Sequence, residues 1–145
     1  MAKERVYVLD DDPNRHSMLD DRLSAQMSEP HQRFFDAESI IKQLTEDIES
    51  GIMVDTVFLD HDLGGEVFVE SEREDCGMEV VRFIVENKPE IRQIVVHTMN
   101  GVAGIEMRNK LMDAGYKNTD YVAFHILCKS LEAFNEDHYT PYGMV

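Results

Sequence analysis

Chemically active side chains follow three apolar stretches of the sequence, at the points where each stretch stops. VYVLDDD ends in Asp10, Asp11 and Asp12, TVFLDHD ends in Asp60, His61 and Asp62, and IVVHTMN ends in His97, Thr98 and Asn100. If these stretches are neighbouring strands of one parallel sheet, their carboxyl ends meet at one edge, where such sheets bind ligands. Carboxylates that converge there raise one another's pKa values and oppose folding. A divalent cation such as Mg²⁺ relieves that repulsion and leaves positions open to a phosphate oxygen.

The sequence therefore predicts a magnesium site held by Asp10, Asp11, Asp60 and Asp62. Alternate residues of a strand face opposite sides, so Asp60 and Asp62 share a side of an extended strand and His61 points away. The candidate catalytic residues beside the cation are Asp60, His61, His97, Thr98 and Asn100. The physical reason for the cluster is that the strand ends deliver charge to a shared cation.

Strand and helix patterns alternate along the chain and predict the elements that position this cluster. Strand-like segments lie at 5–10, 55–60, 91–98 and 120–126, with a weaker one at 32–37. Three of the four strong segments are near-continuously apolar, which is typical of strands covered on both faces. Apolar residues at helical spacing lie between them, and Asp12 with Pro13 forms a helix start. The pattern predicts one α/β domain over residues 1–145, with a doubly wound, five-stranded parallel sheet.

Two segments depart from the minimal pattern. The connection between Gly64 and Gly77 is long, and EVFVE within it predicts a hairpin-like insertion after the third strand. The role of its acidic part, residues 66–75, stays open between a lid and a solvated loop. The residues after Ile126 predict a short last helix and a tail.

Composition limits the partners and the setting. The chain has 29 acidic and 14 basic residues and a net charge of −15, which argues against nucleic acid and anionic membranes as partners. Two cysteines without metal-ligand spacing, a first strand close to the N-terminus and the lack of a membrane-length apolar run predict a reduced, cytoplasmic location.

RVYVLDDDPNRHSMLDDRL, TVFLDHD and IVVHTMNG, in this order, resemble the response-regulator receiver domains, which implies that the sheet is of flavodoxin or receiver type. The resemblance implies that Asp10 and Asp11 bind Mg²⁺, that Asp60 accepts a phosphoryl group, and that Thr98 senses it. Receivers also carry a lysine after the fifth strand, and the sequence leaves open whether His125 or Lys129 replaces it.

The stretches LDHDLGG and HTMNG are more similar to a receiver-like subgroup that is proposed to process cyclic phosphates. This resemblance implies a modified pocket formed by Asp60, His61, Asp62, His97, Thr98 and Asn100. Arg15, near the start of the first helix, either adds a phosphate contact or has only a surface role.

Three functions fit these observations. The first is a signalling receiver with a Mg²⁺-binding acidic pocket and an aspartyl phosphoacceptor, supplied by a kinase or a small phosphodonor and recognised by a protein partner. The second is a metal-dependent phosphoesterase, in which His61 or His97 helps to activate water against a cyclic or other small phosphate ester. The third is a degenerate receiver that binds a protein partner without phosphorylation. Donor, substrate and oligomeric state stay open.

Overall fold

The fold was analysed in a computed structural model, which describes residues 5–27, 29–65 and 68–137. Its strands are β1 (Val6–Leu9), β2 (Gln32–Phe34), β3 (Val54–Leu59), β4 (Ile91–Val96) and β5 (Thr119–Tyr121). Its helices are α1 (Pro13–Leu23), α2 (Ala37–Ser50), α3 (Gly77–Asn87), α4 (Gly101–Asp113) and α5 (Phe124–Asp137). Strand and helix alternate throughout, as the sequence predicts.

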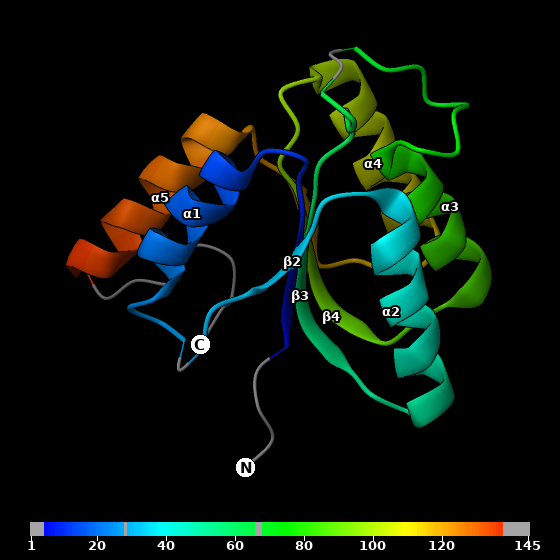
Figure 1. Cartoon of the computed structure of the whole chain (residues 1–145), viewed down its shortest axis with the longest axis horizontal. Coiled ribbons are helices and arrows are strands. Elements are labelled where there is room, and N and C mark those ends of the chain that lie inside the picture. Colours follow the sequence, from blue (N-terminus) through cyan, green and yellow to red (C-terminus); the bar gives the residue numbers. More distant parts are fainter. Residues whose placement is uncertain (1–4, 28, 66–67, 138–145) are drawn as a thin grey trace.

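The strands form one parallel sheet in the order β2-β1-β3-β4-β5. Helices α1 and α5 cover one face, and α2, α3 and α4 cover the other (Figure 1). This is the predicted doubly wound, five-stranded arrangement, and the prediction of the fold class is confirmed. Within the described ranges, no helix has the length and apolar character needed to cross a membrane.

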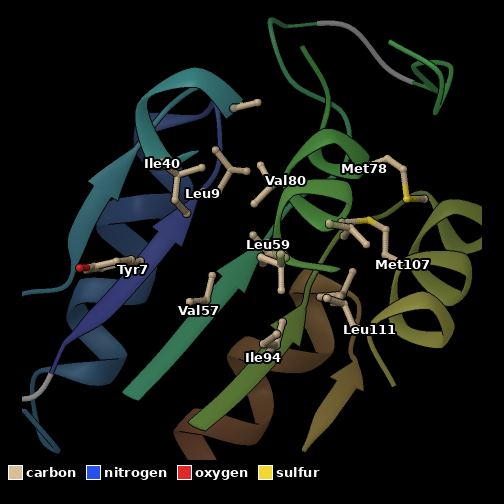
Figure 2. Packing of buried hydrophobic residues seen from close by; sticks show 14 of the residues in the cluster. Tyr7, Leu9, Ile40, Val57, Leu59, Met78, Val80, Ile94, Met107 and Leu111 are labelled. Atoms are coloured by element: carbon tan, nitrogen blue, oxygen red, sulfur yellow. The ribbon is translucent and has the colours of Figure 1, made fainter. Parts of the chain in front are cut away.

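Alternation along the strands divides the core into two layers. Tyr7, Leu9, Val57 and Leu59 pack toward α2, α3 and α4, together with Ile94 and the side chains of Val80, Met107 and Leu111 (Figure 2). Val6, Val8, Phe58 and Val95 pack toward α1 and α5. Because side chains alternate, the residue after Leu9 and the residue after Leu59 face the α1 and α5 side.

The register of the sheet brings the strand ends level with one another. Leu9 pairs with Leu59, and Leu59 pairs with Val96. The ladder continues for one more residue, because the Asp60 amide donates to Leu9 and the His97 amide donates to Leu59, at 3.0 and 2.9 Å. The residues that follow the three central strands therefore form a single row across the sheet.

The end of the chain differs from the sequence prediction. The fifth strand is short, Thr119–Tyr121, and the last helix is not short, because α5 runs for 14 residues from Phe124. Phe124, Leu127, Cys128 and Leu131 are buried in the layer that contains α1. Their spacing is helical, and the apolar run VAFHI that suggested a strand belongs in part to this amphipathic helix.

The connection from β3 to α3 also differs from the prediction. Its described residues, 60–65 and 68–76, form turns and bends and contain no strand, so this part of the connection is not a hairpin. Glu66 and Val67, which belong to the predicted hairpin and acidic arm, lie outside the described residues. The loop returns to its starting point, since the Gly77 amide donates to the His61 carbonyl at 2.8 Å.

Gly77, the first residue of α3, lies directly against the backbone at the end of β3. A Cβ atom at this position would come within 1.9 Å of the Asp60 carbonyl oxygen and 2.8 Å of the His61 Cα atom. Only a residue without a side chain fits such a contact, because backbone atoms cannot move aside without shifting the strand end. Gly77 thus fixes the distance between α3 and the residue Asp60.

We expect Gly77→Ala to lower the free energy of unfolding by roughly 2–4 kcal/mol, because its Cβ overlaps backbone atoms. Gly101→Ala is the matched control, since Gly101 is also the first residue of a helix and its Cβ would meet only the Tyr121 hydroxyl, at 3.6 Å. Urea unfolding of both variants measures the difference. Equal stability of the two variants would contradict the contact.

Candidate functional site

Three side chains of types that can bind a metal ion lie close together in the row that follows β1, β3 and β4. Asp10, Asp60 and His97 are all buried and each offers one ligand atom, and these atoms lie within 4.8 Å of one another. His97 Nε2 donates to Asp10 Oδ2 at 3.0 Å. The convergence of Asp10 and Asp60 is as the sequence predicts, and the third member of the row is an imidazole in place of a carboxylate.

Arg15, in the first turns of α1, supplies the positive charge nearest to these carboxylates. Its Nε lies 2.8 Å from Asp10 Oδ2, and its Nη2 lies 3.2 Å from Asp11 Oδ1 and 3.6 Å from Asp60 Oδ2. The N-terminal turn of α1, which Asp12 caps by accepting from the Asn14 amide at 2.8 Å, aims the guanidinium back over the strand ends. Arg15 therefore touches both members of the buried carboxylate pair.

A cleft of about 430 Å³ opens over this row. Its lining comprises Asp11, Asp12, Pro13, Arg15, Asp60, Asp62, Gly65, His97, Thr98, Met99 and Phe124. Apart from His97, Arg15 is the one basic side chain among these described lining residues. The cleft thus presents carboxylates, an imidazole and a guanidinium to a small molecule.

The two buried carboxylates have opposite electrostatic properties. Burial disfavours the charged form of Asp10, but hydrogen bonds from His97 and Arg15 outweigh that effect and hold the pKa of Asp10 well below its usual range. Burial, together with a smaller contribution from the neighbouring Asp10, raises the pKa of Asp60 to about 6 against the opposing effect of His97. Asp60 is therefore the carboxylate for which an additional cation matters most.

Asp11 and Asp62, which the sequence places in the metal site, use their carboxylates mainly to hold the chain. Asp11 Oδ2 accepts from the Gly65 amide at 2.6 Å. Asp62 accepts from the amides of Phe68 and Val69 at 2.8 and 3.0 Å. Both residues line the cleft, but the three-residue ligand cluster does not include them.

His61 points away from the cleft, as strand alternation predicts. Its side chain is buried, and its Nδ1 donates to Asp62 Oδ1 at 2.7 Å, which leaves Nε2 to pair with the Ser71 hydroxyl at 3.1 Å. Burial opposes the charged form of His61, but hydrogen bonds to Cys76 and Asp62 raise its pKa. This chain of contacts ties the loop before α3 to a carboxylate that lines the cleft, so His61 orients Asp62.

Thr98 and Asn100 lie at the start of α4. Thr98 lines the cleft, and its Oγ1 accepts from the Asn100 amide at 3.1 Å. Asn100 caps α4 by accepting from the Ala103 amide at 3.3 Å, and its Nδ2 donates to Asp62 at 3.4 Å. Thr98 thus lines the cleft, whereas the side chain of Asn100 supports the helix and Asp62.

Neither residue considered as a replacement for the receiver lysine reaches the cleft. His125 and Lys129 both lie on α5 with exposed side chains, and neither lines the cleft. The residue that follows β5 is Val122, whose amide donates to Val96. Phe124 takes the adjoining place at the cleft wall, with its ring 5.8 Å from that of His97.

Solved structures with the same architecture are receiver domains. A receiver domain of a putative LuxO repressor protein from Vibrio parahaemolyticus is 17% identical over 94% of this chain and 92% of that one, with a TM-score of 0.56. The isolated receiver domain of RcsB from Salmonella enterica serovar Typhimurium is 17% identical over 91% and 85%, with a TM-score of 0.60. The response regulator domain of CheB from Thermotoga maritima is 15% identical over 97% and 100%, with a TM-score of 0.57.

The parallel sheet and the acidic strand ends define a receiver domain. The model of the cyclic-phosphate processing receiver domain family matches residues 8–113, and the chain belongs to this family. Its assignment to the receiver superfamily and to this subgroup, made from the sequence motifs, is confirmed. None of the curated proteins compared with the chain matches it.

Sequence reasoning missed two features of the site. The sequence indicates His97 as a candidate catalytic group. Only the register of β3 and β4 shows that it lies in the same row as Asp10 and Asp60. Ser71, the partner of His61, carries no signal in the sequence, because the loop that delivers it has no regular pattern. Arg15 was recognisable, since it lies one helical turn after the Asp10–Asp12 run.

We expect Asp60→Asn to stabilise the metal-free protein at pH 7.5. Because the pKa of Asp60 is raised to about 6 in the folded protein from 3.8, the folded protein loses stability as the pH rises through that window. The amide substitution removes this loss of stability. The gain should be roughly 1–3 kcal/mol at pH 7.5 and should shrink at pH 4.5, where the native carboxyl is protonated.

Urea unfolding in EDTA at both pH values measures this effect. Asp120→Asn, at an exposed position of β5, is the control for the same chemical change. A loss of stability in Asp60→Asn at pH 7.5 would show that the ionised form of Asp60 stabilises the fold.

Proposed function

We propose that the domain binds a small phosphate ester together with a divalent cation and hydrolyses it, the substrate class being the cyclic phosphate of the family description. One observation carries the proposal: Arg15, Asp60 and His97 line the same cleft, with Asp10 beneath them at 2.8 Å from Arg15 and 3.0 Å from His97. A guanidinium next to buried carboxylates and an imidazole suits the recognition of a phosphate through a shared cation.

Arg15 is the residue that would hold the phosphoryl oxygens. Its side chain is 33% exposed and lines the cleft, and its planar guanidinium can donate two parallel hydrogen bonds to a phosphate. The Thr98 hydroxyl accepts from the Asn100 amide, so its own hydrogen is available for a phosphoryl oxygen. Arg15 and Thr98 would therefore bind an anion from opposite sides of the row.

The divalent cation would be held by Asp10, Asp60 and His97. Their donor set fits such an ion, since the ligand atoms of two buried carboxylates and one imidazole lie within 4.8 Å of one another. When bound, such a cation neutralises phosphoryl oxygens and lowers the pKa of water. Hydrolysis adds water across one P–O bond of the cyclic ester: the water oxygen bonds to phosphorus, and the departing ester oxygen takes a proton. The product is a phosphomonoester with a free hydroxyl group.

Turnover of a panel of cyclic phosphates, followed by ³¹P NMR with Mg²⁺ or Mn²⁺, tests the proposal. Arg15→Gln should lower kcat/KM by about 100-fold, because an oriented donor to the phosphoryl group is lost. Arg108→Gln is the matched control, since Arg108 lies on α4 and bonds only to Asn109 among the contacts described. Equal turnover by both variants, or none by the wild-type protein, would refute the proposal.

The position of Asp60 favours a second candidate, a phosphoacceptor of a signalling switch. Asp60 follows β3 and lines the cleft beside Arg15 and Thr98. The RcsB receiver domain, which has the same fold, was solved in the presence of the phosphomimetic BeF₃⁻. In this reaction an Asp60 oxygen bonds to the phosphorus of a kinase or small phosphodonor, and the bond to the donor's leaving group breaks. A protein partner would then recognise the changed surface.

Incubation with acetyl phosphate and a divalent cation separates the two candidates. The switch predicts a phosphoryl mass gain that hydroxylamine removes and that Asp60→Asn lacks, without turnover of cyclic phosphates. Intact-protein mass spectrometry measures the mass gain. Turnover of cyclic phosphates without any covalent phosphoprotein would exclude the switch.

A further inference from the structure

The metal-ligand cluster in the cleft contains a nitrogen donor. His97 is 1% exposed, and its Nε2 lies 3.0 Å from Asp10 Oδ2, so the imidazole edge faces the same point as the two carboxylates. Mg²⁺ binds oxygen ligands almost exclusively, whereas imidazole suits transition-metal dications. The receiver family implies Mg²⁺, and this donor set fits that ion poorly.

We infer that the cation site formed by Asp10, Asp60 and His97 takes a first-row transition-metal dication, Mn²⁺ or Zn²⁺, in preference to Mg²⁺. The inference rests on the proposed function in so far as that function requires a bound cation. It assigns His97 as a direct metal ligand, a role distinct from that of a proton-transfer group.

A site with three carboxylate ligands would need Asp11 or Asp62, whose oxygens accept hydrogen bonds from backbone amides of the loop that follows β3. Asp11 Oδ2 accepts from the Gly65 amide at 2.6 Å, and Asp62 Oδ1 takes hydrogen bonds from His61 and Val69. Withdrawing either carboxylate would remove one of the anchors of this loop. His97 is therefore the available third donor.

The surroundings of His97 leave its ligand form accessible. Its Nδ1 is buried and has no hydrogen-bond partner among the described residues, so the bond to Asp10 is the one described contact that holds the proton on Nε2. Moving the proton from Nε2 to Nδ1 frees the Nε2 lone pair toward the carboxylates. The ring of Phe124, 5.8 Å away, shields the imidazole from solvent.

Metal affinity and pulsed EPR test the inference without any substrate. Isothermal titration should give Mn²⁺ an affinity at least about tenfold higher than that of Mg²⁺. Electron spin echo modulation of the Mn²⁺-loaded protein should show coupling to a histidine nitrogen, which ¹⁵N-histidine labelling identifies. His97→Asn should lose this coupling, and His125→Asn, at an exposed position of α5, should retain it.

His97→Asp provides a second variant, because it restores an all-oxygen donor set. Its preference for Mn²⁺ over Mg²⁺ should fall below that of the wild-type protein. If the His97 variants fail to fold, as circular dichroism would show, the nitrogen coupling and the affinities of the labelled wild-type protein decide the question.

Tighter or equal binding of Mg²⁺, absence of nitrogen coupling, or coupling that persists in a folded His97→Asn variant would each overturn the inference. Its failure differs from failure of the proposed function. Nitrogen coupling without turnover of any phosphate ester refutes the hydrolysis and leaves the metal assignment intact. Turnover supported best by Mg²⁺, without nitrogen coupling, refutes the metal assignment alone.

Discussion

The site depends on the neutralisation of two buried carboxylates that neighbouring strands bring together. Asp10 is fully buried and stays ionised because His97 and Arg15 both donate to it. Asp60, in the next strand, has less compensation, and its raised pKa records the cost. The N-terminal turn of α1, the loop after β3 and the start of α4 all meet this pair. Each of these segments either places a charged or polar side chain next to the pair or holds the backbone beside it.

The residues around the pair fall into two groups: some present polar groups to the cleft, and others bind the backbone that surrounds it. Arg15, Thr98 and His97 present groups that a phosphate or a cation can use. Asp11 and Asp62 have the same chemical type as Asp10 and Asp60, but their oxygens are bound to backbone amides of the neighbouring loop. These chemically equivalent carboxylates therefore differ in role because their hydrogen-bond partners differ. This receiver pocket has an imidazole in the row and no lysine among its described lining residues, and its guanidinium comes from Arg15 on α1.

The sequence was sufficient for the fold and for the convergence of Asp10 and Asp60. Near-continuous apolar strands that alternate with helical patterns leave few topologies, and acidic residues at strand ends have one edge to share. It was not sufficient for His97, because a shift of one residue in the register of β4 would turn this side chain to the other face. The last helix was underestimated because a short apolar run such as VAFHI fits a strand and a buried helix equally well.

The loop after β3 is closed at its base. Its two ends are joined by the hydrogen bond from Gly77 to His61, and the absence of a side chain at Gly77 holds them in place. The exposed stretch at residues 72–75 can change in composition at little energetic expense, since the ends of the loop are already held together. Substitutions in this stretch can therefore accumulate while the carboxylate of Asp60, at the base of the loop, keeps its place.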